Sequence, residues 1–289
     1  MRGGLFAGQG LRAATVLGAL PRRHARVVSA SRRLGYDVRW RVSVAAGRPD
    51  AGLPTVIAQP AIFVAGVVAY ERALESGERF DALMGHSIGE YAALVAAEAM
   101  TFEDALDVVA ARARAMESAA RRNPGGMAAI RGLDRVDAGA IAWSAGVEVA
   151  NDNSTEEIVV SGPDAGLARA ASAAHARGGR VLRLPVAGPF HTEAMAPASA
   201  AVARALEDVS ISAPRIPVVS NVTGLPYESA DDVAALLVQQ VTSLVQFRRG
   251  LEWMWDAGVR GVVDLGPGEV VGRHAYATFA TMERVMTVA

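Results

Sequence analysis

Residues 80–96 read FDALMGHSIGEYAALVA, and this stretch predicts a strand, a tight turn and a helix in succession. The apolar segment from Phe80 to Met84 is typical of a buried strand, and the segment Gly89 to Ala97 is typical of a helix. Between them, Gly85-His86-Ser87-Ile88-Gly89 has the G-x-S-x-G pattern of a nucleophile elbow. The alternative is an ordinary glycine-bounded turn, but the flanking strand and helix favour Ser87 as a nucleophile. The backbone N–H of Ile88, at the helix N-terminus, would face a developing oxyanion.

Outward from the elbow, short apolar strands alternate with Ala-rich helical stretches, which predicts an α/β protein. We expect a buried strand at Leu5 to Ala7, a helix at Gln59 to Leu74 and a second helix at Phe102 to Ala120. Thr101 is the expected N-cap of that second helix.

The pattern changes after the break Pro124-Gly125-Gly126. Strands are expected at Met127 to Arg131, Val147 to Ala150, Glu157 to Ser161 and Arg180 to Val186, with helices at Asp137 to Ala145 and Leu167 to Ala176. This β-α-β-β-α-β order is the ferredoxin-like arrangement. We therefore predict a small domain at 125–187, inserted into a larger α/β domain formed by 1–124 and 188–289.

A nucleophilic serine needs a base, and the chain has five histidines. His86 adjoins the serine on a tight turn, where neighbouring side chains usually diverge. His24 and His175 lie in polar stretches and are expected to be solvated, and His274 lies among mixed residues near the C-terminus. His191 follows a strand and the break Gly188-Pro189, and a helix is expected to start near Thr192. This loop position favours His191 as the base. The alternative is that His191 only packs against Phe190.

Arg112 falls in the middle of an apolar stripe on the helix from Phe102, whereas Arg114 falls on the opposite face. A guanidinium in an apolar setting needs an anionic partner. A structural salt bridge would satisfy it, but beside a nucleophilic serine a clamp on a substrate carboxylate becomes attractive.

Composition excludes several function classes. The 289 residues carry a net charge of −1 with dispersed basic residues, so neither nucleic acid nor an anionic membrane is an expected partner. The absence of Cys and Lys excludes thiolate and lysine Schiff-base chemistry. The N-terminus lacks the features of a signal peptide. The longest apolar run, Pro60 to Tyr70, is shorter than the roughly 20 residues that span a bilayer. A cytoplasmic protein is therefore expected.

A series of short motifs, spread in a fixed order along nearly the whole chain, resembles the motifs of a known protein family. They are Gly8-Gln9-Gly10, Gln59-Pro60-Ala61, Gly85 to Tyr91, Arg112 with Met116, Gly126 to Ile130, Asn151 to Ser154, Ile158 to Gly162, Gly188 to His191, Pro217 to Asn221, and Leu265 to Gly268. Together they resemble the malonyl-CoA:acyl-carrier-protein transacylases and the stand-alone, trans-acting acyltransferases of polyketide synthases. The resemblance implies an α/β-hydrolase-like core with an inserted ferredoxin-like domain.

The resemblance also implies a role for each matching residue. Ser87 would carry the acyl group, His191 would be its base, and the backbone N–H groups of Gln9 and Ile88 would form the oxyanion hole. Arg112 would hold the malonyl carboxylate. The backbone carbonyl of Gln240 would orient the histidine, and Gln59 and Asn153 would lie near the acyl and pantetheine arms.

The same resemblance implies malonyl-CoA as substrate, an acyl carrier protein as partner, and neither a metal nor a redox cofactor. We expect a monomer.

Some positions depart from the family pattern. Ala7 stands where Pro is usual, the loop after Gly10 is unusual, and Ser243-Leu244 replaces a typical Asn-Pro. Phe190 stands where fatty-acid enzymes usually have Ser. In the polyketide acyltransferases that this chain resembles, Phe accompanies malonyl and a small residue accompanies methylmalonyl. These departures slightly favour a polyketide-type enzyme.

Other functions remain open from the sequence. A thioesterase or acyl hydrolase could use the same serine and histidine, but a hydrolase of neutral acyl chains has no use for Arg112. A non-catalytic carrier-protein docking module is disfavoured by intact Ser87, His191 and Arg112. The malonyl-transfer subunit of a malonate decarboxylase would share the same chemistry.

Overall fold

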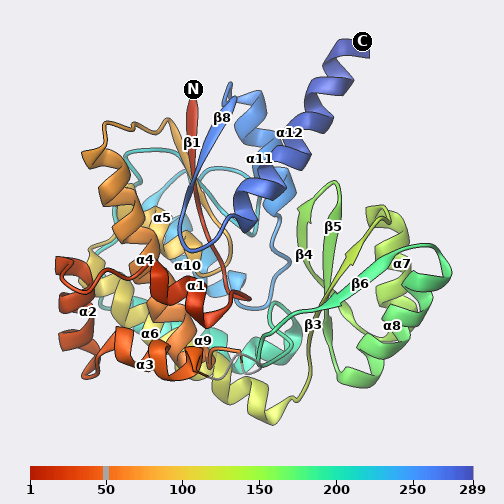
Figure 1. Ribbon diagram of the computed structural model, residues 1–289, viewed down its shortest axis with the longest axis horizontal. Coiled ribbons are helices and arrows are strands. Elements are labelled where there is room, and N and C mark those ends of the chain that lie inside the picture. Colours follow the sequence, from red (N-terminus) through yellow and green to blue (C-terminus); the bar gives the residue numbers. More distant parts are fainter. Residues whose placement is uncertain (48–51, 289) are drawn as a thin grey trace.

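A parallel four-stranded sheet forms the centre of the larger part of the molecule (Figure 1). The structure is a computed structural model that describes residues 1–47 and 52–288. The strand order is β7-β2-β1-β8, and all neighbours are parallel. The strands are β1 (Arg2–Phe6), β2 (Ala82–Gly85), β7 (Val218–Val219) and β8 (Gly261–Leu265).

Helices cover both faces of this sheet because its strands are apolar on both sides. Leu5 packs with helices α11 and α12, and its neighbour Phe6 packs with α4 and α5 on the opposite face. The helices of this lobe are α1 (Ala13–Gly18), α2 (Ala25–Leu34), α3 (Val38–Ala46), α4 (Thr55–Glu75), α5 (Gly89–Ala96), α6 (Phe102–Arg122), α9 (Ala196–Leu206), α10 (Ala230–Gln240), α11 (Phe247–Asp256) and α12 (Val270–Val288).

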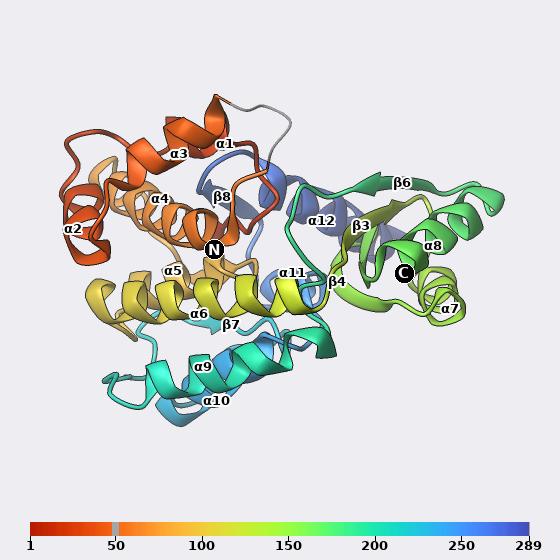
Figure 2. The ribbon, with the colours of Figure 1, turned by 90° about the horizontal axis from the view of Figure 1, so that it is seen from below.

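A separate antiparallel sheet lies to one side of this lobe and carries two helices (Figure 2). Its strand order, β4-β5-β3-β6, places the first strand of the unit between the third and the fourth. The elements are β3 (Gly126–Arg131), α7 (Arg135–Ala145), β4 (Glu148–Ser154), β5 (Glu157–Gly162), α8 (Asp164–Ala176) and β6 (Arg180–Arg183). This is the expected β-α-β-β-α-β unit, so the predicted fold class is confirmed. The predicted limits 125 and 187 enclose the unit, and the division into domains at those residues stays a prediction.

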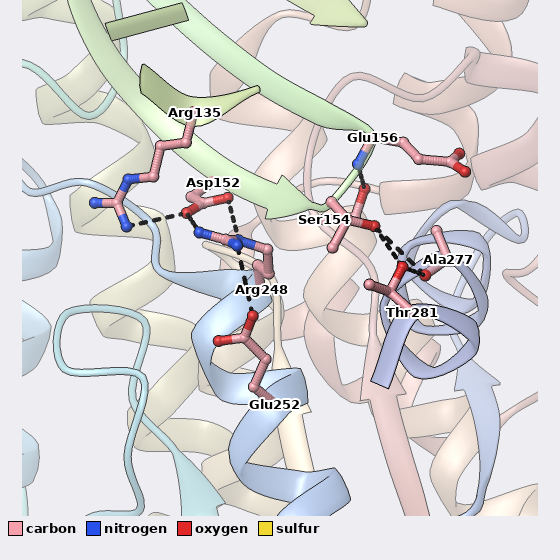
Figure 3. A network of polar contacts seen from close by, with 9 residues as sticks. Arg135, Asp152, Ser154, Glu156, Arg248, Glu252, Ala277 and Thr281 are labelled. Carbon is pink, nitrogen blue, oxygen red and sulfur yellow. Dashed lines mark hydrogen bonds and ion pairs between the residues drawn. The ribbon is translucent and has the colours of Figure 1, made fainter. Parts of the chain in front are cut away.

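The two lobes are joined by a backbone hydrogen bond and by the ion pairs of Asp152, and Figure 3 shows the ion pairs. Asp152 N donates to Val245 O at 2.9 Å, so β4 extends toward the segment before α11. The Asp152 carboxylate accepts from Arg248 at both oxygens, each at 3.0 Å, and Arg135 approaches it at 3.4 Å. A two-point guanidinium–carboxylate contact constrains orientation as well as distance. The junction therefore holds the small sheet in a defined position beside the elbow.

Several element boundaries differ from the sequence expectation. β6 ends at Arg183 rather than Val186, because Pro185 has no N–H to continue the ladder. β4 continues to Ser154 rather than ending at Ala150, through two register irregularities against β5. The expected helix near Thr192 begins as a short 3₁₀ turn (Glu193–Met195) before α9.

The apolar run from Pro60 to Tyr70 lies inside the longer helix α4. The 21 residues of α4 are long and apolar enough, by length and composition alone, to cross a membrane. In the folded chain 67% of its most apolar window is buried, between the sheet and α5, α6 and α3. Its hydrophobicity is accounted for by its place in the core.

Candidate active site

Ser87 stands at the end of β2, where the chain reverses into α5. Its φ of 51° lies in the left-handed region, which is unusual for a residue other than glycine. A Cβ on Gly85 would lie 2.0 Å from Gly89 C, and a Cβ on Gly89 would lie 2.5 Å from Phe6 O. Both glycines are therefore required for this turn, and the predicted elbow is present, with Ser87 in a conformation that is strained for a residue other than glycine.

His191 lies opposite the serine on the loop before α9. Its Nε2 is 2.8 Å from Ser87 Oγ, and its Nδ1 is 3.0 Å from Gln240 O. Because a carbonyl can only accept, Nδ1 carries the proton and Nε2 presents a lone pair to the serine. Burial, followed by the charge of Arg112, lowers the pKa of His191 to about 3, so the ring is neutral near pH 7. A neutral imidazole in contact with a serine hydroxyl can accept its proton.

None of the other histidines occupies this position. His86 Nε2 lies 2.8 Å from Asn153 Oδ1, so its side chain diverges from Ser87 as expected. His175 is exposed, as expected. The expectation that His24 is solvated is wrong: its Nδ1 accepts from Arg26 N and caps α2, and its side chain is 18% exposed. His274 is buried and lies 3.6 Å from Glu157.

Arg112 is fully buried on α6 and reaches the serine. Its Nη2 donates to Ser87 Oγ at 3.1 Å and to Gln240 Oε1 at 2.8 Å. Nε and Nη1 have no hydrogen-bond partner among the described residues, and no described carboxylate forms a salt bridge with this side chain. Burial lowers the pKa of Arg112. The guanidinium thus retains donors that an anion beside Ser87 would satisfy.

Two backbone N–H groups flank the nucleophile as candidates for an oxyanion hole. Ile88 is the N-cap residue of α5, and no side chain caps that end. Within the described chain, neither Ile88 N nor Gln9 N donates a hydrogen bond to another atom. The Gln9 side chain accepts from Gln59 Nε2 at 2.9 Å, which ties the Gly8–Gly10 loop to α4. Both N–H groups are available to a negatively charged oxygen.

The other predicted substrate-binding residues are buried, and they differ in whether their polar atoms already have hydrogen-bond partners. Gln59 Nε2 also contacts Met116 Sδ at 3.4 Å, one turn beyond Arg112 on α6, and its Oε1 has no partner among the described residues. Asn153 uses both ends of its amide, toward His86 and toward Glu157 at 2.8 Å. Phe190 is buried, and its carbonyl accepts from Ser161 Oγ at 2.9 Å. The substrate contacts of these three residues stay predictions.

Gln240 does more than the sequence indicated. Its carbonyl meets His191 as expected, while its side chain links Arg112, Ser87 and Glu90. Sequence reasoning gave no role to Asn221, whose Oδ1 accepts from Ser87 N at 2.6 Å and whose Nδ2 donates to Gly85 O at 2.6 Å. The only signal for it was its place at the end of the Pro217–Asn221 motif.

Metal ligation has no evident place in the described chain. Among residues 1–47 and 52–288, no three His, Asp or Glu side chains are grouped so that they could hold a metal ion. The expectation that the site uses neither a metal nor a redox cofactor stays a prediction.

Comparison with known proteins places the chain in a family. A family model described as "Acyl transferase domain" matches residues 21–288. The malonyl CoA-acyl carrier protein transacylase of Escherichia coli (strain K12) is 36% identical over 248 residues, covering 84% of this chain and 80% of that protein. The polyketide biosynthesis protein ThaF of Burkholderia thailandensis is 38% identical over 275 residues, covering 92% of this chain but only 23% of ThaF.

Solved structures agree with these relatives. A type II polyketide synthase acyl-carrier protein in complex with its malonyl-transacylase, PlMCAT:AntF, matches with a TM-score of 0.87 and 30% identity, covering 97% of this chain and 93% of that one. A model match over most of the chain, together with relatives above 30% identity, decides membership. The chain belongs to the acyl transferase family that contains the malonyl-CoA:acyl-carrier-protein transacylases.

Proposed function

We propose that this chain transfers a malonyl group from coenzyme A, through an ester on Ser87, to the pantetheine thiol of an acyl carrier protein. The observation that carries the proposal is a serine with two partners. Its Oγ lies 2.8 Å from a neutral histidine nitrogen and 3.1 Å from a buried arginine that pairs with no carboxylate of the described chain. The printed names of the relatives support malonyl and the carrier protein as the two reactants.

In the first half-reaction, His191 Nε2 takes the Ser87 proton as Oγ attacks the thioester carbonyl. The resulting oxyanion would accept from Gln9 N and Ile88 N. The intermediate then collapses, the carbon–sulfur bond breaks, and the departing thiolate takes the proton from His191. Malonyl is left on Ser87 as an oxygen ester, and coenzyme A leaves as a thiol.

The second half-reaction is the reverse with a different thiol. His191 takes the proton of the pantetheine thiol, the thiolate attacks the ester, and Ser87 Oγ leaves and regains the proton. Throughout, Gln240 O holds Nδ1–H, so the ring keeps the tautomer that both halves need.

Arg112 favours this transferase over a hydrolase of neutral acyl chains. A buried cation 3.1 Å from the nucleophile is costly for an enzyme whose acyl group brings no charge. A thioesterase would have been favoured had Arg112 paired with a protein carboxylate away from Ser87. The relatives support either polyketide or fatty-acid biosynthesis as the setting.

The expectations of a cytoplasmic monomer that binds neither nucleic acid nor membrane stay predictions. Burial of α4 in the core supports the part concerning the membrane.

Intact mass after incubation with malonyl-CoA, methylmalonyl-CoA and acetyl-CoA, each alone, tests the proposal. We expect one malonyl adduct on the wild-type chain and none on Ser87→Ala. Hydrolysis of malonyl-CoA without transfer to any added carrier protein would contradict it.

A further inference from the structure

Glu90 is a buried carboxylate beside the active site that the proposed mechanism does not use. It lies in the first turn of α5, three residues after Ser87, and its side chain is inaccessible to solvent. Oε1 accepts from Tyr227 Oη at 2.5 Å and from Asn221 N at 3.0 Å, and Oε2 accepts from Gln240 Nε2. No cation of the described chain forms an ion pair with it. Three donors thus stabilise a charge that is otherwise costly to bury.

The contact with Gln240 decides which way the amide of that glutamine faces. Gln240 Nε2 donates to Glu90 Oε2 and to Ser87 O at 3.1 Å, while Gln240 Oε1 accepts from Arg112 Nη2 at 2.8 Å. A flipped amide would set its NH₂ group against the guanidinium and its oxygen against a carboxylate. Both contacts would be repulsive, because a guanidinium only donates and a carboxylate only accepts.

We propose that Glu90 is a positioning residue that acts through Gln240 to hold Arg112 in place for the carboxylate of the acyl substrate. The proposal rests on the proposed function and deepens it, since it names a residue that determines acyl preference. Glu90 touches neither the substrate nor the reacting atoms. Its effect is transmitted along a chain of two hydrogen bonds, from Glu90 Oε2 through the Gln240 amide to Arg112 Nη2, which we call the positioning chain.

A merely structural role makes a different prediction. Through Oε1, Glu90 also holds Asn221 N, and the Asn221 side chain holds the elbow at Ser87 N and Gly85 O. Damage to that branch would impair the nucleophile, and so would slow every acyl group equally. Damage to the positioning chain would impair acyl groups that need Arg112 more than acyl groups that do not.

Glu90→Gln separates the two branches. Its amide oxygen can still accept from Tyr227 and Asn221 N, so its NH₂ group must then face Gln240 Nε2. Two donors would meet, and the Gln240 amide would turn away from its present contact with Arg112. Tyr227→Phe is the matched control when rates are measured at about pH 9, where Glu90 should stay ionised even without this donor. It removes a hydrogen bond to Oε1 that lowers the pKa of Glu90, and it leaves the positioning chain intact.

The experiment measures the rate of acyl-ester formation with malonyl-CoA and with acetyl-CoA, at about pH 9, for the wild type and both variants. We expect the malonyl-to-acetyl ratio to fall by about tenfold or more in Glu90→Gln, as when one hydrogen bond to a charged group is lost. The ratio should be preserved in Tyr227→Phe. An unchanged ratio in Glu90→Gln, which includes the case of an equal fall in rate with both substrates, would overturn the proposal. A wild-type chain that forms no malonyl ester would instead refute the proposed function.

Should Glu90→Gln fail to fold, the wild type provides a second test through pH. Burial raises the pKa of Glu90 to about 7 against the hydrogen bonds that lower it. Protonated Glu90 no longer offers two acceptor oxygens, so the malonyl-to-acetyl ratio should fall as pH drops from about 8 to about 6. The nearby Tyr91 and Tyr227 have pKa values raised by burial and remain neutral there, and His191 titrates near 3. A ratio independent of pH over that range would count against the positioning chain.

Discussion

Replacing Arg112 by Ala should reverse the acyl preference of the enzyme. A malonyl ester on Ser87 would bring its carboxylate within reach of a guanidinium that lies 3.1 Å from Ser87 Oγ and is fully buried. Two unit charges about 4 Å apart interact by roughly 4 kcal/mol at an effective dielectric constant of about 20. Loss of that interaction corresponds to a fall of roughly 10³-fold in kcat/KM for malonyl loading.

Acetyl loading should be spared or should rise in the same variant. An acetyl group has no charge to offer Arg112, so the wild-type enzyme must bury it beside an unpaired cation. Removing that cation also removes one cause of the lowered pKa of His191, which strengthens the base. Arg112→Lys should rescue malonyl loading only partly, because an ammonium cannot reproduce a planar two-point contact.

Quenched-flow measurement of the ester by intact mass, with malonyl-CoA and acetyl-CoA, provides the assay. Arg114→Ala is the matched control, since Arg114 lies on the exposed face of the same helix. Equal losses with both acyl groups in Arg112→Ala would refute the reasoning, because they would show that Arg112 supports the fold or the serine and not the carboxylate.

Five further outcomes are expected. Ser87→Ala should form no malonyl adduct in intact-mass measurements, and wild-type initial rates should follow ping-pong kinetics. His191→Ala should lower transfer by several orders of magnitude while exposed His175→Ala does not, and equal losses would indicate general destabilisation. The wild type should prefer malonyl over methylmalonyl by at most roughly 10–200-fold, measured by competition, and Phe190→Ser should weaken that preference. A wild type that loads both acyl groups equally would refute this role of Phe190. Because the pKa of His191 falls from 6.5 to about 3 on folding, the unfolded chain binds a proton that the folded chain does not. Stability in urea should therefore drop as pH falls from about 6.5 toward 3, and the drop should be shallower in His191→Gln.

The sequence predicted those parts of the site that depend on local pattern. The elbow could be identified because two glycines, an incoming strand and an outgoing helix are all local in the chain. Burial of Arg112 could be predicted because helical periodicity places it among apolar neighbours. Thr101 was likewise predictable as an N-cap, and its side chain accepts from Asp104 N.

Contacts between distant segments were not predictable from pattern. Asn221 and Glu90 are 131 residues apart in sequence, and no periodicity indicates that one holds the other. The role of the Gln240 carbonyl could be assigned only by resemblance. The role of its side chain became evident only in the folded chain, where this last residue of α10 lies beside Ser87 and Glu90. His24 was misjudged because its Arg-rich surroundings suggested solvent, whereas a helix N-terminus needs an acceptor and the imidazole supplies one.

The charge of Arg112 connects substrate choice to the chemistry itself. In the free enzyme this cation lowers the pKa of His191 and donates to Ser87 Oγ, so it opposes protonation of the base and holds the nucleophile. A malonyl carboxylate paired with Arg112 offsets that charge, which makes His191 a stronger base while the substrate is in place. An acyl group without a carboxylate leaves the base weaker and the cation unpaired. Interactions that strengthen only as the reaction proceeds raise kcat and not merely binding. Arg112 therefore favours malonyl twice: it binds the carboxylate of the bound substrate, and through His191 that same ion pair also lowers the barrier to acyl transfer.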